Sequence, residues 1–213
     1  MPEPLRKLDA VAASLQIENV DTDMIWPGST GGSIQKGEQA GHAFYHMRFA
    51  PDGSERAEFV LNQAPWRHAK ILIGGDNFGC GSSRELAVWA LHDWGLRCII
   101  APRFGDIFYS NCCLNGLLPI RLPREAVDRL AAFAADPETA LMTVDLEACI
   151  VAAQGELFHF EMEARPREAL LNGYDAITQT LSDIDNIRAF GRAYGKNFPW
   201  IADIDSRSWG TSA

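Results

Sequence analysis

A stretch of small and polar residues between Gly74 and Glu85 holds the side chains best suited to chemistry. It reads Gly-Gly-Asp-Asn-Phe-Gly-Cys-Gly-Ser-Ser-Arg-Glu, follows a buried-strand pattern at 70–73 and opens a helical pattern. In open α/β sheets, ligands bind outside the carboxyl ends of the strands. Free N–H groups at a helix N-terminus attract anions, and an arginine such as Arg84 can grip a carboxylate with two hydrogen bonds. The segment therefore indicates an anion-binding or catalytic turn.

The same residues also fit a purely structural role. Ser82 and Glu85 have the spacing of a capping box, in which both side chains accept hydrogen bonds from backbone N–H groups at the start of a helix. The glycines would then serve only the turn. Arg84 argues against this interpretation, because a cation in the first helical turn lies at the positive end of the helix dipole. We therefore favour an anion-binding or catalytic turn.

Three motif-based chemistries fit this turn less well. A dinucleotide-binding loop needs Gly-x-Gly-x-x-Gly, whereas Gly79 and Gly81 are followed by Arg84 where the third glycine belongs. A serine-hydrolase elbow needs Gly-x-Ser-x-Gly, which the residues at 81–84 do not supply. A thiol nucleophile at Cys80 needs a nearby base. The sequence alone brings none of the histidines to Cys80; they are His42, His46, His68, His92 and His159.

Strand and helix patterns alternate through the middle of the chain. Short apolar runs at 70–73, 97–101 and 117–120, the first of them β-branched, predict buried strands, and helical patterns at 83–94 and 104–114 lie between them. Strands joined by helices in this order pair in parallel through right-handed crossovers. The middle of the chain therefore predicts a parallel sheet.

The remaining elements predict one α/β domain over residues 1–213. A strand at 9–17 leads to a glycine-rich stretch at about 27–41, which is either a mobile functional loop or a disordered surface insertion. A turn at Gly155 predicts an antiparallel hairpin. We also expect a C-terminal helical segment at about 165–205. The later predicted elements are a helix at 123–135, strands at 143–146, 149–152 and 157–160, and helices at 167–172 and 184–194.

Composition narrows the class of protein. The chain has 213 residues, of which 47% are hydrophobic, and a net charge of −9. This acidic balance argues against a nucleic-acid partner and against docking on an anionic membrane. No apolar run approaches the ~20 residues of a membrane span, and the N-terminus lacks an apolar signal-peptide core. Five cysteines without a Cys-x-x-Cys pair, including the buried-type pair Cys112-Cys113, predict reduced thiols and a cytoplasmic location.

Several blocks of this sequence, taken together and in order, resemble the swivelling domain of the aconitase superfamily. The match runs from about residue 9 to 195, and within the superfamily it is nearest to the small subunits of bacterial 3-isopropylmalate dehydratases. The resemblance implies an α/β swivelling β/β/α domain with a mainly parallel sheet, flanking helices and an antiparallel hairpin. The blocks are Asp21-Thr22-Asp23-x-Ile25, 77–85, 99–111, Gly116-Leu117-Leu118-Pro119 and Asn172-Gly173-x-Asp175-x-Ile177.

The resemblance implies a hydro-lyase that works only as a heteromer. Such enzymes isomerise 2-isopropylmalate and 3-isopropylmalate, by dehydration and rehydration, in leucine biosynthesis. A large partner subunit carries an iron–sulfur cluster on three cysteines, and its open iron acts as a Lewis acid. This chain has no cysteine trio at cluster spacing. We therefore expect a cluster-bearing large subunit, a small dicarboxylate substrate and no metal ligand in this chain.

The resemblance also implies roles for four residues. Ser82 matches the family's base, a serine oxyanion, and Asp23 matches an active-site acidic residue within a hydrogen-bond network. Ser83 and Arg84 match contacts to the substrate carboxylate. A serine hydroxyl is a poor base at neutral pH, but a helix N-terminus and the guanidinium of Arg84 both favour its anion.

Two departures from the family pattern leave the substrate open. The family usually continues after Asp23 with a Pro-Lys-x-Phe/Tyr-Leu loop that discriminates substrates, whereas this chain has Trp-Pro-Gly-Ser-Thr-Gly-Gly-Ser at 26–33. Leu86 stands where the family usually has histidine. The alternatives are a paralogous small subunit for methylmalate, citraconate or dimethylmalate-type substrates, a non-catalytic anion-binding module, and a thiol enzyme using Cys80.

Overall fold

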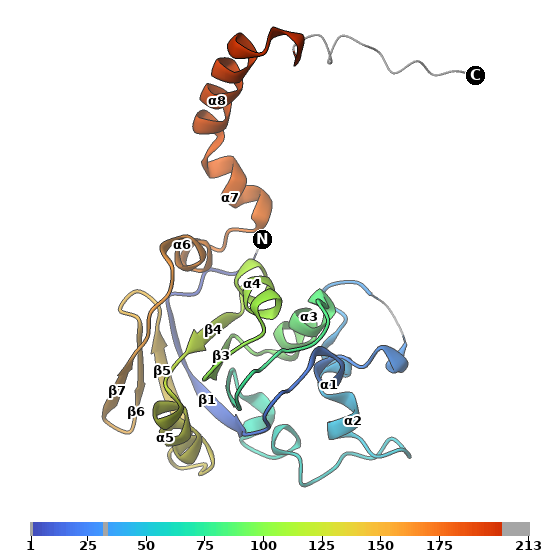
Figure 1. The fold of residues 1–213 in the computed structure, drawn as a ribbon. Helices are drawn as coiled ribbons and strands as arrows, with labels where there is room; N and C mark the ends of the chain where they lie inside the picture. The colour runs from blue at the N-terminus through green and yellow to red at the C-terminus, as the bar shows by residue number, and fades with distance from the viewer. Residues whose placement is uncertain (1, 32–33, 202–213) are drawn as a thin grey trace, which may run out of the picture. The chain divides into compact units, whose positions relative to one another are not determined.

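The chain divides into two compact units, Met1–Asp175 and Ala176–Ala213. The computed structural model describes residues 2–31 and 34–201, and these are drawn as ribbon in Figure 1. Residues 32–33 of the predicted loop at 27–41, and residues 202–205 of the predicted C-terminal helical segment, lie outside the described part of the chain.

The first unit is built on a sheet that is half parallel and half antiparallel. Its described strands lie in the order β4-β3-β2-β1-β5-β6-β7. Strands β4 to β1 pair in parallel, and β5, β6 and β7 continue from β1 in antiparallel pairs. The predicted α/β class, with its parallel block and antiparallel hairpin, is confirmed. The strands are β1 Lys7–Leu15, β2 Ile71–Gly74, β3 Cys98–Ala101, β4 Leu118–Arg121, β5 Leu141–Asp145, β6 Ile150–Ala153 and β7 Glu156–His159.

Helices of ordinary length connect the parallel strands, and shorter ones fill the long connection from β1 to β2. The second unit contains α7, α8 and η5. Helix α7 lies within the helical segment predicted at about 165–205 but was not predicted as a separate helix. The α-helices are α1 Thr22–Ile25, α2 Tyr45–Arg48, α3 Glu85–Trp94, α4 Asp106–Leu114, α5 Arg124–Ala134, α6 Ala164–Asn172, α7 Ala176–Ser182 and α8 Ile184–Asn197. The 3-10 turns are η1 Gly28–Thr30, η2 Ala40–His42, η3 Val60–Asn62, η4 Trp66–His68 and η5 Pro199–Ile201.

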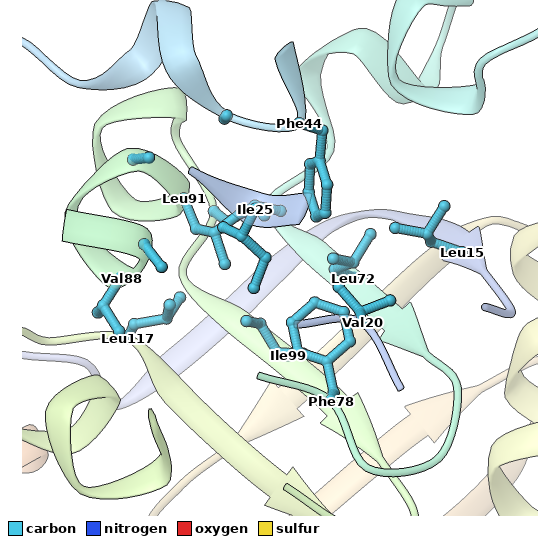
Figure 2. Close-up of a cluster of buried hydrophobic side chains, with 14 of the residues drawn as sticks. Leu15, Val20, Ile25, Phe44, Leu72, Phe78, Val88, Leu91, Ile99 and Leu117 are labelled. Carbon is cyan, nitrogen blue, oxygen red and sulfur yellow. The ribbon is translucent and has the colours of Figure 1, made fainter. Parts of the chain in front are cut away.

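Alternation along the central strands divides the core into two clusters. Leu72 and Ile99 belong to one cluster, whereas Ile71, Ile73 and Ile100 belong to the other. Successive side chains of a strand point to opposite faces, so this division places one cluster on each face of the sheet. Figure 2 shows the first cluster, where α1 and α3 contribute apolar side chains. Helix α5 covers the second. Burial on both faces explains the nearly continuous apolar runs of these strands.

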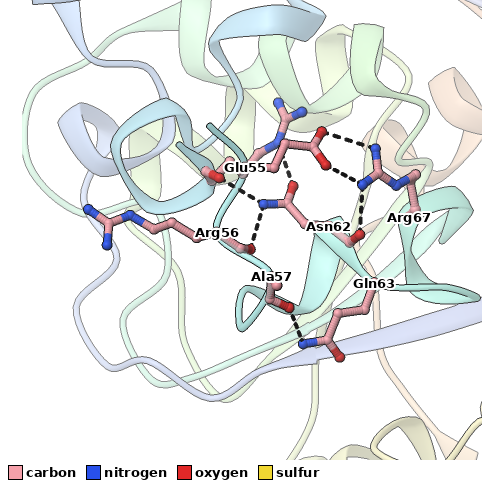
Figure 3. A network of polar contacts seen from close by, with 7 residues as sticks. Glu55, Arg56, Ala57, Asn62, Gln63 and Arg67 are labelled. Atoms are coloured by element: carbon pink, nitrogen blue, oxygen red, sulfur yellow. Dashed lines mark hydrogen bonds and ion pairs between the residues drawn. The ribbon is translucent and has the colours of Figure 1, made fainter. Parts of the chain in front are cut away.

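The connection between β1 and β2 depends on buried polar groups rather than on helical periodicity. Arg48 at the end of α2 is buried, with its guanidinium carbon 3.9 Å from the ring centre of Trp94. Burial lowers the pKa of Arg48 to about 10. The amide nitrogen of Asn62 donates to the carbonyl oxygens of Arg48 (2.8 Å) and Arg56 (2.9 Å). Arg67, bonded to Glu55, closes this network (Figure 3).

Gly79 marks the closest approach between the turn after β2 and α4. Its φ of +71° lies in the left-handed region, and a Cβ built on it would lie 2.1 Å from Cγ of Phe108. The neighbouring backbone is fixed as well, because the Phe78 N–H donates to Arg103 O (3.0 Å) and the Gly105 N–H donates to Phe78 O (3.0 Å). Only glycine fits this position without moving α4.

We predict that Gly79→Ala lowers the free energy of unfolding by about 3 kcal/mol, because left-handed strain and overpacking add together. Gly155→Ala is the matched control, since Gly155 has a φ of +79° and no heavy atom within 4 Å of its built Cβ. The control should cost about 1 kcal/mol from backbone strain alone. Urea unfolding of both variants measures the difference, and equal losses would show that the contact with Phe108 relaxes freely.

Candidate active site at the Cys80–Arg84 turn

Two distant segments meet at the carboxyl end of β2. The N–H groups of Gly79 and Cys80 both donate to the carbonyl oxygen of Val20, at 2.7 and 3.2 Å. The Thr22 N–H donates to Cys80 O at 3.0 Å, and Asp21 forms a parallel bridge with Cys80. These bonds bring the Asp-Thr-Asp motif beside the Gly-Ser-Ser-Arg turn, as expected if both serve one site.

Thr22 links the motif directly to Ser82. Its side chain is 2% exposed, and its hydroxyl donates to Ser82 O at 2.9 Å. The same hydroxyl lies 3.3 Å from Ser82 Oγ. A hydroxyl has one hydrogen, so with that hydrogen on the carbonyl the Thr22 oxygen accepts from the Ser82 hydroxyl. Ser82 itself is exposed. Its hydroxyl is therefore held by a buried partner and is also accessible to a ligand.

Asp23 and Arg84 form an ion pair next to Ser82. Helix α1 begins at Thr22 because the carboxylate of Asp21 accepts a hydrogen bond from the Met24 N–H at 2.7 Å. This cap places Asp23 in the first turn, where its carboxylate accepts a hydrogen bond from Nη1 of Arg84. The pair leaves the remaining N–H groups of the guanidinium for an incoming carboxylate.

The structure therefore brings the four predicted site residues to one surface region. Ser82 and Arg84 lie on the turn, Ser83 stands exposed between them, and Asp23 reaches Arg84 from α1. Thr22, to which the sequence analysis assigned no role, is the buried connection between the two segments. Its place inside the Asp-Thr-Asp motif is the one signal by which it could have been found.

The capping box, which the sequence offered only as the alternative interpretation, does not form, and α3 begins two residues later than expected. Arg84 is the N-cap residue and makes no capping hydrogen bond with its side chain. Ser82 Oγ lies beside Thr22 instead, and the Glu85 carboxylate accepts from Asn115 Nδ2 at 2.8 Å. Tertiary partners therefore take both side chains that the local motif would have used. Ser82 precedes the first turn of α3, and its described side-chain partner is Thr22 rather than the helix N-terminus.

Cys80 is a poor nucleophile in this setting. Partial burial raises the pKa of its thiol, and the nearby carboxylate of Asp21 raises that pKa further. A thiol with a raised pKa carries little thiolate at neutral pH, and thiolate is the reactive form. The thiol-enzyme alternative is therefore disfavoured. The predicted packing role of the adjacent pair is confirmed, since Cys112 and Cys113 are both buried.

The start of the loop at 26–33 lies against the site. The Trp26 ring is buried, and its Nε1 donates to Gln39 Oε1 at 3.0 Å. A Cβ built on Gly28 would lie 3.7 Å from Nη1 of Arg84 and 3.7 Å from the Trp26 ring. The loop position that departs from the family pattern therefore neighbours the guanidinium expected to hold the substrate.

The described residues do not fit an iron–sulfur cluster. Over residues 2–31 and 34–201, no group of three or more His, Cys, Asp or Glu side chains could hold a metal ion.

Within the same ranges, no helix is both long enough and apolar enough to cross a bilayer.

Comparison with known proteins identifies the class to which this fold and site belong. Residues 3–125, which include the sheet's parallel strands and the Cys80–Arg84 turn, match the Aconitase C-terminal domain family. The fold also resembles a crystal structure of 3-isopropylmalate dehydratase from Methanocaldococcus jannaschii, with a TM-score of 0.62 and 24% identity. That likeness covers 87% of this chain and 99% of the archaeal chain.

Curated relatives narrow the class to one family. The 3-isopropylmalate dehydratase small subunit of Rhodospirillum centenum is 49% identical over 93% of this chain and 98% of its own length. That of Gluconobacter oxydans is also 49% identical, over 93% of this chain and 95% of its own length. The chain therefore belongs to the 3-isopropylmalate dehydratase small subunit family, within the aconitase superfamily.

We predict that Cys80 alkylation by iodoacetamide stays slow at neutral pH and rises with a midpoint above the ordinary thiol value. A raised pKa means that thiolate appears only at higher pH, so the rate at pH 7 is low in the folded chain. The same chain unfolded in urea is the control, with an expected midpoint near ~8.5. Mass spectrometry of the Cys80 peptide measures the rate; a folded midpoint at or below the unfolded one would contradict this account.

Proposed function

We propose that this chain is the small subunit of a two-subunit hydro-lyase that interconverts 2-isopropylmalate and 3-isopropylmalate in leucine biosynthesis. The relatives named above support the reaction. The observation that carries the proposal is the placement of Ser82, held by buried Thr22 beside the Asp23–Arg84 ion pair. Free cysteines agree with a cytoplasmic enzyme.

The partner is a large subunit that holds an iron–sulfur cluster. When bound, that cluster supplies Lewis-acid activation of the substrate hydroxyl. The present chain supplies the residues that hold the substrate and move its proton. The exposed positions of Ser82 and Ser83 suit this division, because a docking subunit can bring its own site to them.

Arg84 and Ser83 bind a substrate carboxylate in this proposal. The planar guanidinium offers two parallel N–H donors to a carboxylate, which fixes both the position and the orientation of that group. Asp23 holds the guanidinium through Nη1. Asp23 therefore fixes the orientation of the Arg84 guanidinium and adds a negative charge beside it.

Ser82 removes the proton from the carbon next to the bound carboxylate. Its oxyanion needs nearby positive charge and hydrogen-bond donors. Arg84 supplies the charge two residues away in sequence. The Thr22 hydroxyl lies 3.3 Å from Ser82 Oγ and becomes a donor to the oxyanion if its hydrogen turns from the Ser82 carbonyl.

Ser82→Ala, reconstituted with its large subunit, tests the proposal. Loss of a general base should lower kcat by about 1,000-fold while KM changes little, because the carboxylate contacts remain. Turnover is followed by the absorbance of the unsaturated diacid. Ser54→Ala is the control, since Ser54 bonds only to Asp52 among the described contacts of its side chain. Normal turnover in the Ser82 variant would exclude Ser82 as the base.

A further inference from the structure

Two histidines hold the first turn of the loop at 26–33. The turn is η1, and its two hydroxyl side chains each meet an imidazole. Ser29 Oγ lies 3.0 Å from Nε2 of His46, and Thr30 Oγ1 lies 2.6 Å from Nδ1 of His42. Neither histidine belongs to the candidate active site described above, and both lie outside the motifs that carry the family resemblance.

The hydrogen bonds of Thr30 fix the position of a proton on His42. The Thr30 hydroxyl donates to the carbonyl oxygen of Pro27 at 2.7 Å. With its only hydrogen used there, the Thr30 oxygen must accept from His42. The ring of His42 therefore carries hydrogen on Nδ1. This donor is present both in the Nδ1–H tautomer and in the imidazolium ion.

Both imidazoles belong to segments that pack against buried side chains. His42 ends η2, and its ring centre lies 5.8 Å from that of Trp26, which is itself buried. His46 lies on α2, which ends at buried Arg48 with its stacking partner Trp94. The polar network of Figure 3 secures the segment that follows α2.

The first residue of η1, Gly28, lies next to Arg84 of the candidate active site. This residue begins η1, and its built Cβ would lie 3.7 Å from Nη1 of Arg84. A shift of η1 by about one ångström would therefore change the space beside the guanidinium. Since Arg84 also bonds to Asp23, such a shift would alter the surroundings of a bound carboxylate without touching Ser82.

We propose that His42 and His46 are positioning residues that clamp η1 against Arg84 and so set the substrate affinity of this subunit. The inference rests on the proposed role of Arg84 in binding substrate. Loss of either clamp should raise KM and leave kcat nearly unchanged, because proton transfer at Ser82 does not use η1. Substitutions that place an amide where the required ring nitrogen lies should preserve affinity.

The two clamps use different ring nitrogens, which gives a reciprocal test. An asparagine amide nitrogen donates from the place of Nδ1, whereas a glutamine amide reaches the place of Nε2 and there donates through its nitrogen or accepts through its oxygen. We expect His42→Gln to raise KM for 3-isopropylmalate about tenfold, the equivalent of one lost hydrogen bond, while His42→Asn stays within about threefold. At His46 the order reverses, so His46→Asn raises KM and His46→Gln does not. Steady-state kinetics of the reconstituted pair measure both.

Matched controls separate the clamp from general effects of losing an imidazole. Thr30→Ser keeps the hydroxyl and should behave as the wild type, whereas Thr30→Val should match His42→Gln. His159 lies exposed on β7, and its asparagine and glutamine variants should leave both kinetic constants unchanged. Equal KM values for the asparagine and glutamine variants at both clamp positions would overturn the proposal.

Nitrogen NMR of the isolated chain tests the clamp without any turnover. The His42 ring should show a hydrogen-bonded Nδ1–H that is lost in Thr30→Val and kept in Thr30→Ser. An unprotonated Nδ1 would overturn the proposal even if the reconstituted enzyme is active. A protonated, Thr30-dependent Nδ1 in a pair that does not turn over isopropylmalate would instead place the failure in the proposed function.

Discussion

The position of Ser82 in the candidate active site depends on a partly buried hydrogen bond between two residues that lie sixty positions apart in the sequence. The Thr22 hydroxyl donates to the carbonyl oxygen of Ser82, and the same Thr22 oxygen lies 3.3 Å from Ser82 Oγ. Exposed loops usually vary in conformation, so a catalytic hydroxyl on such a turn needs an anchor from a rigid element. Thr22 provides that anchor because it is buried and begins α1. Thr22 directly precedes Asp23, so the same contact connects Ser82 to the Asp23–Arg84 pair.

The rest of the fold makes this anchor rigid. The parallel strands are buried on both faces, and their carboxyl ends carry the turn that holds Ser82. Gly79 lets α4 pack directly against the backbone of that turn, which leaves little freedom for movement. The structure thus combines a stiff scaffold with exposed hydroxyl groups at Ser82 and Ser83. This combination suits a subunit whose site is completed by another chain, because the exposed groups must be in position before the partner docks.

Sequence patterns predicted the parts of the structure that local physics controls. The short apolar runs predicted β2, β3 and β4 to within one residue, and their alternation with helical patterns predicted the parallel order. The connection from β1 to β2 was not predicted, because its short helices have no periodicity and depend on buried Arg48 and Asn62. The alternative capping box does not form for a similar reason. Ser82 has a distant partner in Thr22, and no local pattern records such a contact.

The most direct test of the anchor is the kcat of Thr22→Val and Thr22→Ser in the reconstituted enzyme. Valine keeps the shape of the buried side chain but loses the hydroxyl, so the backbone of Ser82 loses its donor. We expect Thr22→Val to lower kcat at least tenfold and Thr22→Ser to stay within about threefold of the wild type. Equal turnover in the valine variant and the wild type would show that Ser82 is held without Thr22, and would contradict the role of Thr22 as the anchor of the site.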